Sequence, residues 1–185
     1  MNNKRAKLEN PLRLDELKPT ETLKRIGLGE NHSLVDIGAG SGIFTLPAAR
    51  ITKNKVYALE INEEMLSIID QKAQNEGATN IELVKVQGDE FTLEDQAANI
   101  VLLVTVLHEI QNKTALLKEV KRIIKGNGKV VIIEFHKRNT PMGPPIDNRI
   151  GKQEVICELQ ESGFLVHEEF DLGDNFYCLV FILKA

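Results

Sequence analysis

Cysteine is scarce in this sequence, and Cys157 and Cys178 are its only two. They stand apart in apolar patterns, and neither a Cys-x-x-Cys pair nor a histidine array accompanies them. Disulfide frameworks and zinc sites need such groupings. No other set of His, Cys, Asp or Glu has the spacing of metal ligands. We therefore expect two buried, reduced thiols, no disulfide and no metal site.

Long apolar runs and basic blocks are also missing. The longest apolar run, Ile100 to Leu107, is interrupted by Thr105 and is far shorter than the ~20 residues of a membrane span. The N-terminal MNNKRAKLEN lacks the apolar core of a signal peptide. A net charge of -4 disfavours a surface that neutralises many phosphates. We expect a cytoplasmic protein with no membrane span and no nucleic-acid partner.

The length of 185 residues and the hydrophobic content of 42% suit one domain with a full core. Strand and helix patterns alternate, which predicts a largely parallel sheet with helices on both faces. We expect a polar tail and a helical flap in residues 1–28 and the main domain in residues 29–185. The expected strands are 33–37, 55–60, 81–86, 98–105, 129–135, 164–171 and 176–183, and the main helices are 45–51, 63–76, 112–125 and 152–162. Ligands of such sheets lie beyond the carboxyl ends of the strands.

The segment LVDIGAGSGIFTL, residues 34–46, predicts a buried strand, a tight turn and the start of a helix. Gly38, Gly40 and Gly42 permit positive φ and a close approach of a ligand to the backbone. The free amides at the start of the next helix point at that ligand. Glycines also mark ordinary turns, so this segment alone leaves both readings open.

Acidic residues lie in or just after the first three expected strands. Glu60 ends the second strand, where an acid can accept hydrogen bonds from both ribose hydroxyls of a nucleoside. The alternative is a solvated glutamate that caps a helix. Asp89 follows the third strand and can accept the amine of adenine, although it equally suits a turn. Asp36 would repel a pyrophosphate and attract an ammonium group, and Ile43 stands where a dinucleotide motif has its third glycine.

These segments together resemble the class I S-adenosylmethionine-dependent methyltransferases. The resemblance rests on VDIGAGSG, ALEIN, QGDEF, VTVLHEI and the terminal strand pair, and it covers about residues 33–185. The chain is most similar to small proteins related to the ubiquinone/menaquinone C-methyltransferases, including Leu-His-Glu after the fourth strand and Gly-Pro-Pro before the penultimate helix. Asn99 departs from the aspartate common in relatives, and we expect only a structural effect there.

The resemblance implies a fold, a cofactor and its ligands. The fold is an α/β, Rossmann-like three-layer sandwich with a seven-stranded sheet of order 3-2-1-4-5-7-6 and an antiparallel seventh strand. The cofactor is S-adenosyl-L-methionine, with S-adenosyl-L-homocysteine as the product. The implied cofactor contacts are Gly38, Ala39 and Gly40 at the methionine part, Glu60 at the ribose, Ile61 and Met65 around the adenine, Asp89 and Glu90 at its edge, and the carbonyls of Val104 and Thr105 at the ammonium.

Methyl transfer is an in-line displacement, so most of its acceleration can come from positioning the acceptor, and a base is optional. If one is needed, His108 is the best-placed candidate because it follows the central strand, and His136 is second. Either can instead be a hydrogen-bonded wall of the pocket.

The irregular stretch 136–149 is longer than ordinary connections and is a candidate for substrate selection, or else a plain surface linker. Its cations Lys137, Arg138 and Arg149 favour an acceptor that is small, partly apolar and neutral or anionic.

Three functions remain open from the sequence. The leading hypothesis is a small-molecule methyltransferase. A dinucleotide-dependent oxidoreductase is disfavoured by Ile43 and Asp36. A protein that binds S-adenosylmethionine only as a sensor, or to assemble with a partner, would carry the same cofactor residues. The acceptor, the methylated atom and the oligomeric state are not determined by the sequence.

Overall fold

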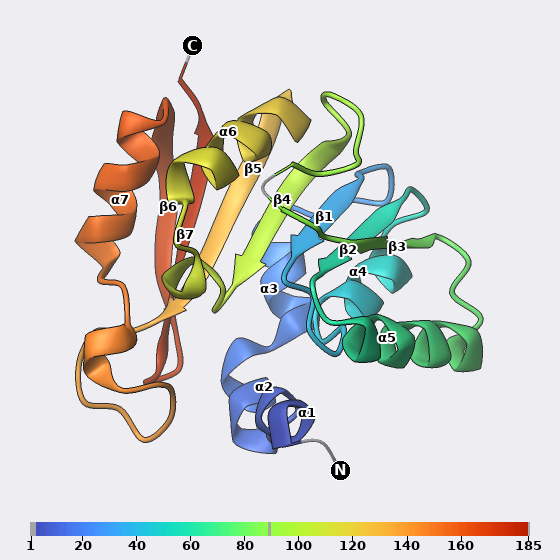
Figure 1. Ribbon diagram of the computed structural model, residues 1–185, viewed down its shortest axis with the longest axis horizontal. Helices are drawn as coiled ribbons and strands as arrows, with labels where there is room; N and C mark the ends of the chain where they lie inside the picture. The colour runs from blue at the N-terminus through green and yellow to red at the C-terminus, as the bar shows by residue number, and fades with distance from the viewer. Residues whose placement is uncertain (1–2, 89, 185) are drawn as a thin grey trace. The chain divides into compact units, whose positions relative to one another are not determined.

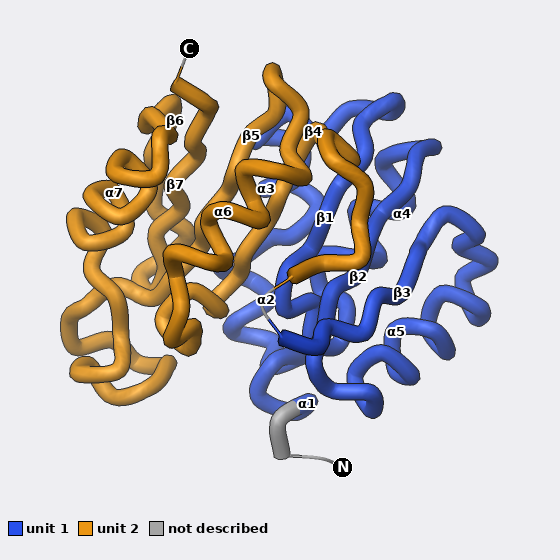
Figure 2. The backbone as a smooth tube through the Cα atoms, turned by 45° about the horizontal axis from the view of Figure 1, so that its top comes forward, with its two compact units in different colours: residues 1–88 blue, residues 89–185 orange. Residues whose placement is uncertain are grey.

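The computed structural model describes residues 3–88 and 90–184. The chain divides into two compact units, residues 1–88 and 89–185 (Figure 2). Each unit combines strands with helices that cover them. The expected boundary at residue 28 remains a prediction, and the helices before it belong to the first unit.

The first unit is built on three parallel strands, β1 (Leu34–Ile37), β2 (Val56–Glu60) and β3 (Ile81–Lys85), with β2 in the centre (Figure 1). Helix α4 packs on β2 and β3, as does α5. Asn62 caps the start of α5, because its side chain accepts a hydrogen bond from the amide of Glu64. The helices are α1 (Asn3–Leu8), α2 (Pro11–Leu17), α3 (Pro19–Arg25), α4 (Thr45–Ile51) and α5 (Glu63–Glu76).

The second unit contains β4 (Ala98–Val104), β5 (Ile124–Phe135), β6 (Phe164–Leu172) and β7 (Phe176–Leu183) (Figure 1). Strand β4 is parallel to β5, whereas β7 runs antiparallel to both β5 and β6. Helix α6 packs on β5, and α7 packs on β6 and β7. The helical segments are η1 (Leu107–Glu109), α6 (Lys113–Ile123), η2 (Ile146–Asn148) and α7 (Lys152–Glu161).

The strand order β3-β2-β1-β4-β5-β7-β6 is the predicted one, and the seventh strand is antiparallel as expected. The long apolar strands form the core, because β4 and β7 are buried along nearly their whole length. Strand β6 is half exposed, as suits its place at the end of the order. The α/β Rossmann-like fold is therefore confirmed.

Helix α6 ends earlier than predicted. We expected it to reach Lys125 and stop at a left-handed glycine, but it ends at Ile123 and β5 begins at the buried, extended Ile124. Ile124 pairs with Ala98, and this burial outweighs helix continuation. Gly128 lies inside β5, where a side chain would come within 2.9 Å of the carbonyl oxygen of Asn99. Glycine at this position allows β4 and β5 to approach each other closely.

Two further expectations were wrong. Residues 3–8 form helix α1 where a polar tail was expected. Cys157 is exposed, whereas Cys178 is buried as expected, and neither of the two forms a disulfide bond. The reason is helical phase: α7 buries Val155 and Leu159, and Cys157 lies between them on the other side of the helix. Asn99, the departure noted above, accepts a hydrogen bond from Lys125 at 2.9 Å.

Candidate functional site

The glycine turn of the first unit follows β1 directly and has the backbone that the sequence predicts. Gly38, Gly40 and Gly42 have φ of 70°, 54° and 81°, which side chains rarely tolerate. The amides of Gly38 and Ala39 both donate to the carbonyl of Leu59, at 2.8 and 3.0 Å. The turn is thereby fixed against the end of β2.

Glu60 connects this turn to the next helix. Its carboxylate accepts a 2.9 Å hydrogen bond from the amide of Gly40, and its other oxygen accepts from the amides of Ile61 and Asn62 at 2.9 and 3.0 Å. The residue is only 5% exposed, which rules out the solvated glutamate considered above. A carboxylate has about four acceptor positions, so one remains for a further donor such as a ribose hydroxyl.

The N-terminal helix borders the same turn, a feature that the sequence did not reveal. The ammonium of Lys72 donates to the carbonyl of Ser41 at 2.8 Å and to Glu9 at 2.7 Å. A side chain on Gly40 would come within 2.9 Å of Leu8. These contacts hold the end of α1 beside the glycines, so this helix limits how a ligand reaches them.

Asp36 is buried in β1, where it is 2% exposed. The hydroxyl of Thr45 donates a 2.6 Å hydrogen bond to its carboxylate. Burial raises the pKa of Asp36 to about 6, and the nearby charge of Glu60 adds to the rise while Thr45 opposes it. The carboxyl group of Asp36 therefore changes its protonation state near pH 6.

This raised pKa predicts a pH-dependent stability. The folded chain holds the proton of Asp36 more tightly than the unfolded chain, so its stabilising contribution is complete below pH 3.8 and is lost as the pH rises through about 6. The loss is ~3 kcal/mol. Urea unfolding between pH 4 and pH 7 should show Asp36→Asn gaining about that much free energy of unfolding relative to the parent protein.

Thr45→Val is the matched variant for this measurement. It removes the hydroxyl that favours the ionised carboxylate, so the stability should fall more steeply with pH than in the parent. Parallel curves for the parent and Asp36→Asn would show that Asp36 does not control this dependence.

The residues expected around an adenine differ in accessibility. Ile61 is 67% exposed, which is unusual for a large apolar side chain, and it lies directly after Glu60. Met65 has no exposed surface and so offers nothing to a ligand in this conformation. Glu90 is exposed, and Asp89 lies outside the described residues. The exposed Ile61 is the apolar surface available at this point.

In the second unit the end of β4 is strained. Thr105 has a φ of 54°, which is rare for a β-branched residue, and its amide donates to the carbonyl of Ile133 at 2.7 Å. Val104 before it is nearly buried. Backbone strain of this kind persists where surrounding structure enforces it and is concentrated at functional sites. The sequence pointed to these two residues but not to the strain.

His108 forms a dyad with Glu134 of β5. The imidazole Nδ1 lies 2.8 Å from the Glu134 carboxylate, which also accepts from the backbone amide of His108 at 3.2 Å. Glu134 is 1% exposed. A carboxylate accepts hydrogen bonds, so Nδ1 carries the hydrogen and Nε2 presents its lone pair. The candidate base is thus held in a defined orientation by a residue that the sequence did not reveal.

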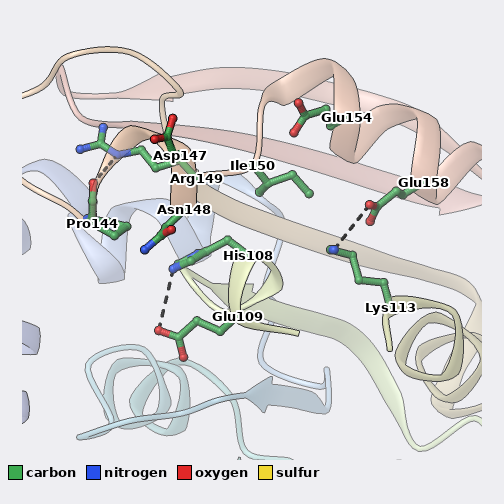
Figure 3. Close-up of a pocket in the computed structure, with 10 residues that line it drawn as sticks. All are labelled: His108, Glu109, Lys113, Pro144, Asp147, Asn148, Arg149, Ile150, Glu154 and Glu158. Atoms are coloured by element: carbon green, nitrogen blue, oxygen red, sulfur yellow. Dashed lines mark hydrogen bonds and ion pairs between the residues drawn. The ribbon is translucent and has the colours of Figure 1, made fainter. Parts of the chain in front are cut away.

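The Nε2 side of His108 faces a cavity of about 600 Å³ within the second unit (Figure 3). Glu109 lies on one side of the ring nitrogen and Asn148 on the other (Figure 3). His136, the second candidate base, does not line this cavity; it packs on Tyr177, and burial lowers its pKa. The lining residues are His108, Glu109, Lys113, Pro144, Asp147, Asn148, Arg149, Ile150, Glu154 and Glu158.

The irregular stretch 136–149 forms one wall of this cavity and is held by Arg149. The guanidinium is buried and donates to the carbonyls of Pro144, His136, Arg138 and Met142 and to the hydroxyl of Thr140, at 2.6 to 3.1 Å. It also lies 5.5 Å from the ring of Phe135. These contacts make the stretch an ordered wall.

Two further searches covered the described residues alone. Within 3–88 and 90–184, no three His, Cys, Asp or Glu side chains are grouped to hold a metal ion. No helix in that part of the chain has the length and hydropathy to cross a membrane. The expectation of metal-independent chemistry stays a prediction, which turnover in the presence of a chelator would test.

The comparisons with known proteins agree on one family. Residues 35–132 match the model of a methyltransferase domain. The chain is 26% identical over 124 residues to a ubiquinone/menaquinone biosynthesis C-methyltransferase of Hahella chejuensis, covering 65% of this chain and 50% of that protein. It is 26% identical over 116 residues to a demethylmenaquinone methyltransferase of Bacillus subtilis, covering 62% and 50%. The chain spans about half the length of these relatives.

A solved structure resembles the chain along nearly its whole length. It is described as a SAM dependent methyltransferase from Aquifex aeolicus, is 27% identical and superposes with a TM-score of 0.92. The likeness covers 97% of each chain.

Proposed function

Because the chain belongs to the methyltransferase domain family, we propose that it transfers the methyl group of S-adenosylmethionine to a small-molecule acceptor. The observation that carries the proposal is the buried carboxylate of Glu60, bound to the amide of Gly40. This contact joins the acid expected at a ribose to the glycine turn expected at the methionine part. The cofactor supplies an electrophilic methyl group on a sulfonium.

The residues present fit this cofactor. The positive φ values of Gly38 and Gly40 let the backbone of the glycine turn come close to a ligand, and Glu60 retains one acceptor position for the ribose. Ile61 offers an apolar surface to the adenine. The carbonyls of Val104 and Thr105 receive the ammonium, and the strain at Thr105 supports a functional role for that backbone.

His108 takes a proton from the acceptor when the acceptor carries one. Its Nε2 faces the cavity, and Glu134 stabilises the imidazolium that forms. When S-adenosylmethionine is bound, the cavity residues would orient the acceptor for in-line attack on the methyl group, and this positioning would supply most of the acceleration.

Two measurements test the proposal. Calorimetry should show that the protein binds S-adenosylmethionine and S-adenosylhomocysteine with micromolar affinity and does not bind NAD. Incubation with methyl-labelled S-adenosylmethionine and a metabolite extract should then transfer label to a small molecule. Binding without transfer would favour a sensor or an assembly protein, and binding of NAD in place of S-adenosylmethionine would contradict the assignment of the cofactor.

A further inference from the structure

The cavity beside His108 is strongly polar and rich in carboxylates. Among its lining residues, Pro144 and Ile150 are the apolar ones. Four carboxylates, from Glu109, Asp147, Glu154 and Glu158, stand against the two cations Lys113 and Arg149. A long apolar tail finds little surface here, whereas a polar or positively charged acceptor finds several partners.

Both cations already contact other residues of the protein. The guanidinium of Arg149 donates hydrogen bonds to four backbone carbonyls and a threonine hydroxyl of the irregular stretch. The ammonium of Lys113 lies 3.7 Å from Glu158 (Figure 3). The donors of Arg149 are therefore used within the protein, and the charge of Lys113 is partly offset by Glu158.

The remaining cations of the stretch are committed as well. Lys137 pairs with Glu154 at 2.9 Å, and Arg138 donates to the carbonyl of Asp174 at 3.4 Å. The sequence-based expectation of a neutral or anionic acceptor rested on these cations. Their engagement within the protein removes its basis.

Two carboxylates of the cavity keep their charge available. Glu109 lies 3.8 Å from Nε2 of His108 and is 69% exposed along its side chain. Asp147 is exposed on η2 and makes no ion pair within residues 3–88 and 90–184. Figure 3 shows Glu109 beside His108 and Asp147 on the irregular stretch. Glu109 therefore brings negative charge beside the candidate base, and Asp147 adds a second negative charge from the irregular stretch, farther from the ring.

We infer that the methyl acceptor is a small amine that enters the cavity as an ammonium ion and is methylated on nitrogen. The inference rests on the proposed function. The carboxylates of Glu109 and Asp147 attract the ammonium, and the Nε2 lone pair of His108 takes one of its protons.

Atoms, charge and electrons balance in this methyl transfer. The freed nitrogen lone pair forms a bond to the methyl carbon as the carbon–sulfur bond breaks, and that electron pair stays on sulfur. The nitrogen now bears the positive charge that the sulfonium loses. The proton on His108 passes to solvent, and the buried carboxylate of Glu134 stabilises the imidazolium until it leaves.

A fractionated extract tests the substrate class. A metabolite extract is separated into molecules retained on a cation exchanger, molecules retained on an anion exchanger, and the flow-through, and each is incubated with the protein and methyl-labelled S-adenosylmethionine. Label should enter the cation-exchanger fraction, in products that remain basic and volatile on alkalinisation or that form amine derivatives. Label in either other fraction alone would overturn the inference and leave the proposed function intact. Absence of transfer in all three, with the cofactor bound, would contradict both.

Charge variants provide the second test, using the labelled amine fraction as acceptor. The double variant Glu109→Gln with Asp147→Asn should raise KM by about tenfold, with kcat within about twofold and the affinity for S-adenosylmethionine unchanged. Salt should raise KM in the parent and have little effect in the variant. Glu161→Gln, an exposed carboxylate of α7 outside the lining, is the control. An unchanged KM in the double variant would overturn the inference.

Discussion

Replacing His108 with alanine is expected to lower kcat of methyl transfer by ~10²- to 10⁴-fold at neutral pH. In the proposed reaction His108 is the base, because Glu134 contacts Nδ1 and Nε2 faces the cavity. Affinity for S-adenosylmethionine should stay within about twofold. Single-turnover kinetics with labelled cofactor measure the rate, and calorimetry measures the affinity.

Glu134→Gln separates orientation of the base from mere presence of a side chain. The amide has the size of the carboxylate but not its charge, so the imidazolium loses a charge-assisted hydrogen bond, and we expect ~10- to 100-fold slower transfer. The acidic limb of the pH profile of kcat/KM should move to lower pH, because the imidazole is harder to protonate without the anion. A role confined to packing would slow transfer without moving that limb.

Two other histidines are the controls for this dyad. His167→Ala changes an exposed residue of β6 and should leave kcat unaltered. His136→Ala should have a smaller effect than His108→Ala, because His136 packs on Tyr177 and does not line the cavity. If His136→Ala were the slower variant, the assignment of the base would be wrong.

The first unit of the molecule could be predicted well because its site is local in sequence. The glycine turn follows β1 within a few residues, and the turn itself requires positive φ at Gly38, Gly40 and Gly42. The sequence did not predict the hydrogen bond from Gly40 to Glu60, but it did single out both residues. Strand ends and glycines were therefore sufficient to predict the backbone conformation of this turn.

The dyad was missed because it joins two segments that are distant in sequence. Glu134 lies in VVIIEF, an apolar strand in which one acid is buried. A buried carboxylate is costly unless it is paired, so this isolated glutamate was a usable signal for a functional partner. The role of Arg149 left no comparable signal, since its partners are backbone carbonyls, which a sequence does not distinguish.

The end of α6 shows a different limit. Gly126 and Gly128 have the composition of a helix stop, yet they lie inside β5. Local preference favoured a cap, and pairing of the buried Ile124 with Ala98 prevailed. Cys157 was misplaced for a related reason, because an apolar neighbourhood in sequence does not fix which side of a helix faces the core.

Replacing Glu60 with alanine is expected to weaken binding of S-adenosylhomocysteine by ~10- to 100-fold, because one or two charge-assisted hydrogen bonds to the ribose are lost. The same carboxylate also holds the amides of Gly40, Ile61 and Asn62. Calorimetry alone therefore does not separate a lost ligand contact from a loosened turn.

Two further measurements separate these causes. Asn62→Ala removes the side-chain cap on Glu64 at the same helix start and should cost ~1 kcal/mol of stability while leaving affinity within about twofold. A 2′-deoxyribose analogue of S-adenosylhomocysteine should bind the parent protein about tenfold more weakly than S-adenosylhomocysteine does. Glu60→Ala should bind the two compounds almost equally, because this variant lacks the carboxylate that pairs with the 2′-hydroxyl. An equal loss in both proteins would show that Glu60 shapes the turn without contacting the ribose.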